Sequence, residues 1–165
     1  GHSPDSLLDT YQSERDSNTA EFINMAIRLG GLINAADSEG ALRAAMTKPD
    51  PEDTAEIKSI YPPLGRGLGV GKNAGHQFGQ PRMIDGKRMD DVIGYHPVIV
   101  ANSALAEQIV RPSHIRVVTP DIAPDATEHL ARFGTSAVVL RPDRYILGCA
   151  ETPSELTALL PLLSG

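Results

Sequence analysis

Residues 137–149 constrain the fold of this chain more than any other stretch of the sequence. The segment 137–140 is continuously apolar and rich in β-branched side chains, 141–144 places a proline and an aspartate at the centre of a turn, and 145–149 is mostly apolar again. This pattern predicts a β-hairpin. Because the first strand has no polar alternation, both faces of its sheet must be covered, and helices from the flanking sequence must cover them.

Strand and helix patterns alternate from Gly94 to the end of the chain. They predict strands at 97–101 and 115–118, helices at 103–110 and 125–133, the hairpin, and a closing helix at 153–163 with Thr152 as its N-cap. In this β-α-β-α-β-β-α order, we expect strands separated by a helix to pair in parallel and the last strand to form an antiparallel edge. The helices at 103–110 and 153–163 should cover the faces of the sheet. The order and size resemble the thioredoxin fold, so the predicted fold class is α/β with a thioredoxin-like domain.

A helical segment is predicted ahead of this domain. Its expected helices cover residues 4–14, 19–33, 38–46 and 53–60. Thr19 suits the N-cap of the second helix, and Gly30-Gly31 weakens the end of that helix. Leu7, Leu8 and Tyr11 lie on one side of the first helix and have no obvious partner inside the chain, so a helix this short would be marginal in water by itself.

Glycine and proline exclude regular structure from residues 61–81, and a loop of this length in a compact protein is usually functional or a linker. We therefore divide the chain into a helical segment at 1–60, a linker at 61–81 and the thioredoxin-like domain at 82–165. Residues 89–93 are expected to pair as a short edge segment, with Asp90 and Asp91 exposed to solvent.

Charge and composition exclude several kinds of partner. The net charge of -6 comes from scattered acidic residues, and the chain has no run of Lys or Arg, which argues against a nucleic-acid partner. No apolar run approaches the roughly 20 residues that span a bilayer, so no membrane partner is expected. A single cysteine, Cys149, cannot form an internal disulfide, which favours a reducing, cytoplasmic compartment.

The sequence does not carry a local catalytic motif. Redox chemistry in a thioredoxin-like fold needs a Cys-x-x-Cys pair at the start of the first helix, but this chain has no sulfur between Ala101 and Ala106. Thr135-Ser136 replaces the proline that usually precedes the third strand, and Cys149 is expected to be a buried, inert thiol. The histidines are too dispersed for a metal site. We therefore expect no catalytic, cofactor-binding or metal-ligating residue in this chain.

The glycine-rich segment 65–72 (GRGLGVGK) suggests a phosphate-binding loop, but its spacing is wrong. The G-x4-G-K pattern requires a glycine at position 66, which is Arg66, and a Ser or Thr at position 73, which is Asn73. The segment also follows Pro62-Pro63, where such a loop needs the end of a strand. We favour a linker as the interpretation.

Three segments, in order along the chain, resemble one enzyme family. Residues 7–15 (LLDTYQSER) resemble the segment that ends the flavin-binding part of class A FAD-dependent aromatic monooxygenases. Residues 80–83 (QPRM) and 89–94 (MDDVIG) are similar to a stretch of the 3-(3-hydroxyphenyl)propionate hydroxylase and phenol hydroxylase-like branch. Residues 141–145 (RPDRY) resemble the hairpin of the C-terminal thioredoxin-like domain of these enzymes. The similarity covers essentially the whole chain.

The resemblance implies that the chain is the C-terminal part of such an enzyme. The glycine-rich turn for the ADP part of FAD and the two other flavin motifs of the family are absent, and they would lie before Gly1. The implied parent uses FAD and NAD(P)H to hydroxylate a phenolic ring. In this family the thioredoxin-like domain is noncatalytic, packs against the N-terminal flavin domain that is missing here, and contributes subunit contacts, including those of a homodimer.

The residues that we assign to these structural contacts lie in all three segments. They are Tyr11, Glu14 and Arg15 against the missing domain, Gln80 and Pro81 in the connecting loop, and Arg141, Pro142, Asp143 and Arg144 in the hairpin turn. The main alternative is a free-standing, redox-inactive thioredoxin-like module that binds a protein partner through 61–81 or the first helices. A small enzyme that uses His or Asp residues is a third interpretation, with little support.

Overall fold

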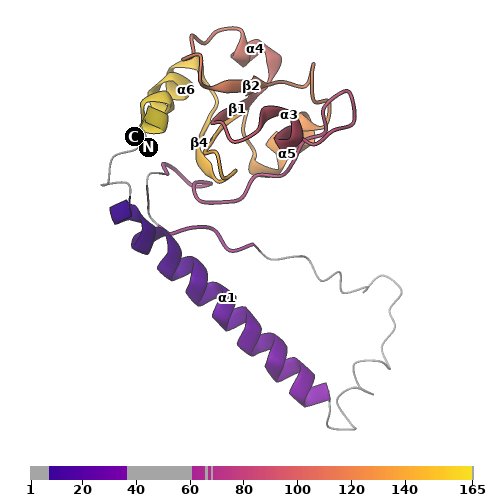
Figure 1. Ribbon diagram of the computed structural model, residues 1–165, viewed down its shortest axis with the longest axis vertical. Helices are drawn as coiled ribbons and strands as arrows, with labels where there is room; N and C mark the ends of the chain where they lie inside the picture. Colours follow the sequence, from indigo (N-terminus) through magenta and orange to yellow (C-terminus); the bar gives the residue numbers. More distant parts are fainter. Residues whose placement is uncertain (1–7, 37–60, 66, 68, 165) are drawn as a thin grey trace.

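A long helix and an α/β domain make up the structure, a computed structural model that describes residues 8–36, 61–65, 67 and 69–164 (Figure 1). The elements are α1 (Asp9–Ala36), α3 (Met89–Ile93), β1 (Val98–Ala101), α4 (Ser103–Ala106), β2 (Arg116–Val118), α5 (Ala126–Phe133), β3 (Ala137–Leu140), β4 (Ile146–Ala150), α6 (Pro153–Leu159) and the 3-10 helix η2 (Leu160–Ser164). The helices predicted at 38–46 and 53–60 lie outside the described residues. No described helix has the length and apolar content that crossing a membrane requires.

The four strands form one mixed sheet in the order β2-β1-β3-β4. β1 and β2 are parallel, whereas β3 is antiparallel to both β1 and β4. The β-α-β-α-β-β-α order and the α/β class are confirmed, and each strand lies within one residue of its predicted bounds. The expectation that every strand after a helix pairs in parallel is wrong for β3.

The path between β2 and β3 explains why β3 runs the other way. Ala137 at the start of β3 pairs with Ala101 at the end of β1, and the Asn102 amide donates a hydrogen bond to the Ser136 carbonyl at 3.0 Å. The segment 119–136, which contains α5, therefore returns the chain to the end of the sheet that it has just left. Helical spacing shows only that a helix intervenes and does not show at which end of the sheet the chain re-enters.

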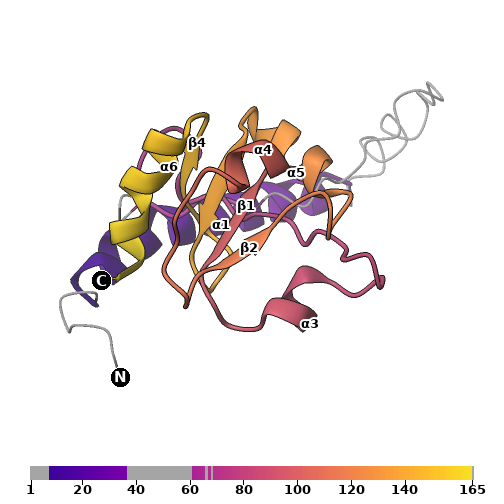
Figure 2. The same ribbon diagram turned by 90° about the horizontal axis from the view of Figure 1, so that it is seen from above.

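Two apolar clusters cover the two faces of the sheet. Side chains of α3 and α5, together with Phe78, cover one face, and side chains of α4, α6 and η2 cover the other. Figures 1 and 2 show α3 and α6 on opposite sides of the domain. The helices predicted at 103–110 and 153–163 thus share one face. α4, which Asn102 caps, ends at Ala106 and is four residues shorter than predicted. Burial on both faces agrees with the continuously apolar sequence of β1 and β3.

Local signals place the ends of several elements correctly. Thr152 caps α6 in a capping box with Glu155, as its position before Pro153 predicts. Gly134 ends α5 in the left-handed conformation that such a stop requires. Residues 89–93, predicted to be an edge segment, instead form α3, whose first turn carries Asp90 and Asp91 at the end that favours negative charge.

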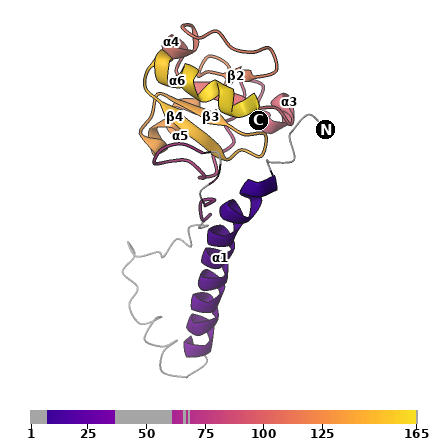
Figure 3. The ribbon, with the colours of Figure 1, turned by 90° about the vertical axis from the view of Figure 1, so that its left-hand side faces the viewer.

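The N-terminal region forms one helix where two were predicted. α1 runs without a break from Asp9 to Ala36. The polar stretch at 12–18 consists largely of residues that helices tolerate, and Gly30-Gly31 costs only about 1 kcal/mol per glycine, so neither needs to interrupt the hydrogen-bond ladder. The beginning of α1 lies beside the domain and the rest extends away from it (Figures 1 and 3).

The glycine- and proline-rich segment runs along the outer edge of β4. The amides of Val70 and Gly75 donate to the carbonyls of Leu147 and Ile146 at 2.7 and 2.9 Å, and the Ile146 amide donates to His76 at 2.8 Å. Isolated bridges join Val70 to Gly148 and Gln77 to Tyr145. The segment thereby satisfies backbone groups that an edge strand would otherwise expose.

Candidate functional site

The hairpin turn between β3 and β4 is the point at which the three sequence segments converge. The turn is closed by hydrogen bonds from the Arg144 amide to the Arg141 carbonyl at 2.9 Å and from the Arg141 amide to the Tyr145 carbonyl at 3.0 Å. Arg144 has a φ of 67°, in the left-handed region that few residues other than glycine adopt. Its side chain and that of Arg141 bind two different parts of the chain.

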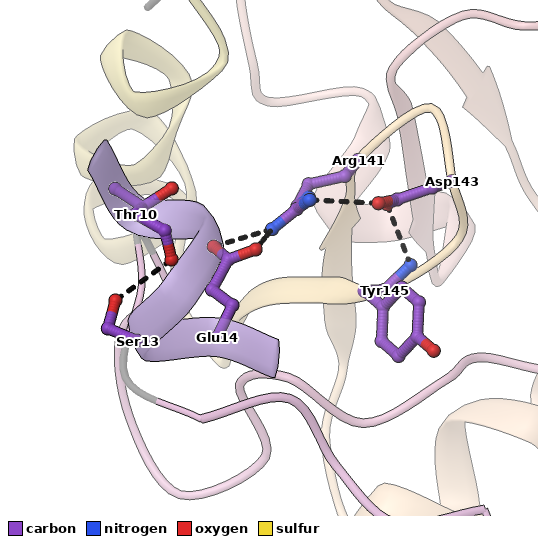
Figure 4. Close-up of polar contacts among 6 residues, drawn as sticks. All are labelled: Thr10, Ser13, Glu14, Arg141, Asp143 and Tyr145. Carbon is purple, nitrogen blue, oxygen red and sulfur yellow. Dashed lines mark hydrogen bonds and ion pairs between the residues drawn. The ribbon is translucent and has the colours of Figure 1, made fainter. Parts of the chain in front are cut away.

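Arg141 binds the first segment. Its Nη1 donates to both carboxylate oxygens of Glu14 on α1 at 2.8 and 2.9 Å, and its Nη2 donates to Asp143 at 2.8 Å (Figure 4). Glu14 is only 6% exposed. Burial by itself lowers the pKa of the Arg141 guanidinium, but the hydrogen bonds and charges of Glu14 and Asp143 outweigh burial and raise the pKa above its usual value. Arg141 is therefore positively charged at any physiological pH.

Arg144 binds the second segment. Its guanidinium, in a side chain almost wholly buried, donates to the carbonyls of His96, at 2.8 Å, and Gly94, and forms an ion pair with Asp90. Asp90 also receives a hydrogen bond from the Gln80 side-chain amide and donates its own amide to Gln80 at 3.2 Å. Asp90 is exposed to solvent, as predicted, but it also neutralises a buried arginine, which the sequence did not indicate.

Contacts on one side of α1 hold this helix to the domain. The Gly65 amide donates to the Glu14 carbonyl at 2.8 Å, and the side-chain amide of Asn18, which is 3% exposed, donates to the Pro62 carbonyl at 2.7 Å. A Cβ on Gly65 would overlap the Ser13 carbonyl, and one on Gly67 would overlap the Glu14 carboxylate. These glycines therefore allow a backbone to lie against a helix.

Several large apolar side chains on α1 and directly before it are exposed in the part of the chain that the structure describes. Those at least two-fifths exposed are Leu8, Tyr11, Phe22, Ile23 and Ile27. With about 3.6 residues per turn they are spread around the helix rather than gathered on one face, and Phe22 lies one turn from the buried Asn18. An exposed apolar surface of this kind marks a site where something else packs.

The structure brings together most of the residues predicted from the sequence. Glu14, Gln80, Arg141, Asp143 and Arg144 take part in the two networks, and Pro81 is buried next to them, where its carbonyl accepts from Met89 at 2.9 Å. Pro142 is half-buried at the tip of the turn, and Tyr11 and Arg15 are exposed on α1.

Sequence reasoning missed Asn18, Asp90 and the role of Gly65 and Gly67. The alternate spacing of glycines from position 65 was the available signal for a backbone that packs closely on one side.

Two cavities flank the turn. One, of about 300 Å³, lies between α1 and the turn and is lined by Glu14, Arg141, Tyr145 and the glycines of 65–75. The other, of about 440 Å³, is lined by Gln80, Asp90, Tyr95, Asp143 and Arg144. Within the described parts of the chain, every buried side-chain nitrogen and oxygen already has a hydrogen-bond partner, and no group of three potential ligands could hold a metal ion. The turn therefore joins α1 to the residues around α3 with the hydrogen-bonding capacity of its buried side chains already used within the chain.

The residues of this junction do not suit FAD. A flavin dinucleotide needs a glycine-rich turn that leads from a strand into a helix and offers free amides to the pyrophosphate. The amides of Gly65, Val70 and Gly75 instead bind carbonyls of Glu14, Leu147 and Ile146, and the next described helix after the glycines is α3.

The position of a thioredoxin active site holds only neutral and acidic groups that bind one another. Asn102 caps α4, and the Ser103 hydroxyl donates to Asp121. At the start of β3, the Ser136 amide donates to Glu151 at 3.1 Å. Cys149 is half-buried in β4, whereas a redox cysteine in that fold lies at the start of the first helix. Its Sγ accepts a hydrogen bond from the Asn73 side-chain amide at 3.5 Å.

Cys149 should react slowly, because burial raises the pKa of its thiol and the hydrogen bonds from Asn73 and Thr135 do not compensate. At pH 8 we expect iodoacetamide to alkylate the folded chain about tenfold more slowly than the chain unfolded in urea, since the thiolate is the reactive form. Mass spectrometry of a time course measures both rates. Equal rates would contradict the inert thiol.

Comparisons with known proteins agree with the fold and the motifs. The chain is 30% identical to a probable NADH-specific resorcinol 4-hydroxylase of Rhodococcus jostii (strain RHA1), in an alignment that covers 96% of this chain and 34% of that protein. Its fold is similar to that of the OxyS anhydrotetracycline hydroxylase from Streptomyces rimosus, with a TM-score of 0.57, 22% identity and coverage of 98% of this chain and 36% of the other. It is also similar to RebC soaked with chromopyrrolic acid, with a TM-score of 0.60, 18% identity and coverage of 100% and 38%. No protein-family model matches the chain.

These findings define the class of the protein. The chain is a thioredoxin-like α/β domain with an attached long helix, of the kind found in aromatic hydroxylases, and it spans about a third of the length of the relatives that it matches. The resemblance read from the three segments is confirmed: the chain is the counterpart of the C-terminal part of a class A FAD-dependent aromatic monooxygenase.

Proposed function

We propose that this chain is the noncatalytic C-terminal thioredoxin-like domain of an aromatic-ring hydroxylase that depends on FAD and NAD(P)H. The observation that carries the proposal is the alignment of almost the whole chain with about a third of a probable NADH-specific resorcinol 4-hydroxylase. In the whole enzyme, the flavin supplies the hydroxylation chemistry and the protein supplies positioning. The role of this domain is packing and subunit contacts in a cytoplasmic enzyme, including the contacts of a homodimer.

The exposed apolar side chains of α1 support a packing role. Among them are Phe22 and Ile27, which are 43% and 66% exposed. The missing N-terminal flavin domain is the partner that fits, because it would be covalently joined to the beginning of α1. In this proposal residues 1–60 belong structurally to the flavin domain, residues 82–165 form the thioredoxin-like domain, and residues 61–81 link the two.

The proposed lack of a catalytic role is supported by the residues that stand where a thioredoxin-like oxidoreductase has its active site. The first turn of α4 carries Ser103 and Leu105 where an oxidoreductase would have cysteines. The amides of Gly65 and Gly75 bind backbone carbonyls of Glu14 and Ile146 and are not available to a phosphate.

The test uses the reading frame that encodes this chain together with the coding sequence before Gly1. We expect the longer protein to purify with FAD and to oxidise NADH or NADPH faster when a phenol such as resorcinol is added. The chain alone, mixed with FAD and separated by gel filtration, should elute without the flavin. Stoichiometric flavin on the chain alone would contradict the noncatalytic assignment, and a longer protein with neither flavin nor phenol-stimulated activity would contradict the parent enzyme.

The alternative is a free-standing, redox-inactive thioredoxin-like module that binds a protein partner. It is favoured by the complete pairing of buried polar side chains within the described residues, which is expected of a unit that can fold by itself. The DNA sequence upstream of the Gly1 codon distinguishes the two. A start codon at this point, preceded by a stop codon in frame, would favour the module, whereas an open frame of several hundred codons that includes G-x-G-x-x-G favours the hydroxylase.

A further inference from the structure

We propose that Arg141 is a positioning residue that, through Glu14, sets the angle at which α1 leaves the thioredoxin-like domain. The inference rests on the proposed function only where it concerns what α1 carries: in the hydroxylase, this angle would orient the flavin-binding part of the protein. The ion pair and the helix geometry belong to this chain and can be tested without any flavin.

The contacts between α1 and the domain form a pivot. Those that join them at Ser13, Glu14 and Asn18 span less than two helical turns near the beginning of α1. From Glu21 to Arg28 every side chain is exposed except that of Met25, which is half-buried. At 1.5 Å per residue, α1 extends roughly 27 Å beyond Asn18, so a tilt of about 10° at the pivot would move its far end by about 5 Å.

Among the described contacts of this pivot, the Glu14–Arg141 ion pair is the one that reaches the hairpin of the sheet. The other hydrogen bonds, from Asn18 and to the Glu14 carbonyl, join α1 to residues 62–65 ahead of the sheet, and no large apolar side chain of α1 is buried among the described residues. The Nη1 atom of Arg141 donates to both oxygens of Glu14, and its Nη2 atom donates to Asp143. Because the guanidinium is planar and rigid, binding at two of its nitrogens fixes the direction in which Nη1 meets Glu14 as well as the distance.

The turn that carries Arg141 is itself held rigidly. Arg144, three residues later, is anchored to Asp90 and to the carbonyls of Gly94 and His96 on the far side of the turn. The same turn thus binds α3 and the residues after it through Arg144, and binds α1 through Arg141. The buried pairing of Glu14 also makes the contact costly to lose, because a carboxylate only 6% exposed would be left without its cation.

The experiment measures the distance between two spin labels, one on α1 and one on the domain. The labels are placed at the exposed positions Arg28→Cys and Glu107→Cys in a chain that carries Cys149→Ser, and the labelled chain is diluted with unlabelled chain so that pairs between copies do not contribute. Pulsed electron resonance then gives the distribution of distances. We expect one narrow distribution for the parent chain and one at least twofold broader when Arg141→Gln is added.

Three further variants make the result specific. Glu14→Gln removes the charge from the α1 side with almost no change of shape and should broaden the distribution as Arg141→Gln does. Arg141→Lys keeps the charge but has one nitrogen in place of the two that bind Glu14 and Asp143, so it should give an intermediate width. Arg132→Gln removes an arginine whose ion pair with Glu128 lies on α5, away from α1, and should change nothing. Circular dichroism checks that α1 remains helical in each variant.

An unchanged distribution in both Arg141→Gln and Glu14→Gln, with α1 intact, would overturn the proposal. Broadening in Arg132→Gln as well would also overturn it, since the effect would then not be specific to the pivot. If the longer protein proves to have no flavin chemistry, only the proposed function fails, because the distances are measured on this chain alone.

Discussion

Replacing Arg144 with alanine is expected to lower the free energy of unfolding by about 3 kcal/mol, at the low end of the range for a broken buried ion pair. The side chain is almost fully buried, and its removal leaves Asp90 without its cation and the carbonyls of Gly94 and His96 without this donor. The low end applies because the Asp90 side chain is 45% exposed and water can solvate it afterwards. Urea unfolding followed by circular dichroism measures the change.

Two variants separate the ion pair from other effects of the substitution. Arg132→Ala removes an arginine that is 62% exposed and paired on the surface of α5, and it should change the stability by no more than about 0.5 kcal/mol. Arg144→Gly removes the same side chain as Arg144→Ala but relieves the left-handed φ of 67°, so it should be about 1 kcal/mol more stable than the alanine variant. A loss below about 1 kcal/mol for Arg144→Ala would contradict the structural importance of the network.

Replacing Gly75 with alanine is expected to cost about 3 kcal/mol, from overpacking and backbone strain together. Gly75 is buried with a φ of 80°, and a Cβ there would lie 2.6 Å from the carbonyl oxygen of Leu64, a backbone atom that cannot rotate away. The Gly75 amide also binds the Ile146 carbonyl on β4, so the strain would loosen the segment that covers the sheet edge.

Gly71 provides a matched control for this prediction. It has a similar φ of 91°, but a Cβ at this position would meet no atom within 4 Å. Gly71→Ala should therefore cost only the backbone term of about 1 kcal/mol. Thermal or urea unfolding of the two variants gives the difference, and equal losses would show that the close approach of residues 64 and 75 does not matter.

The parts of the fold that were predictable from the sequence depend on neighbouring residues. The β-branched runs of β1 and β3, the N-cap at Thr152 and the glycine after α5 act over a few positions, and the structure places each where it was expected. Elements whose local signal is ambiguous were misread, as at 89–93, where five residues are too few to show a helical period. The extent of α1 was predicted wrongly because the polar stretch at 12–18, near its beginning, was taken for a break between two helices.

The resemblance to a family of hydroxylases could identify the important residues of the site but not their partners. Glu14, Gln80 and the turn residues were all singled out, whereas the assignment of Glu14 to a contact with the missing domain did not anticipate that it binds Arg141 of its own chain. Asn18 and Asp90 carried no signal that set them apart from other polar residues.

The class of fold, the absence of a redox pair and the positions of most strands and caps could be predicted because they follow from residue types within a turn or a strand. The direction of β3, the side of α1 that faces the domain and the contact between Glu14 and Arg141, 127 positions apart, became visible in the folded chain alone. A charged side chain has the same local pattern whether it faces water or a buried counter-ion. Its partner is selected by the path of the whole chain.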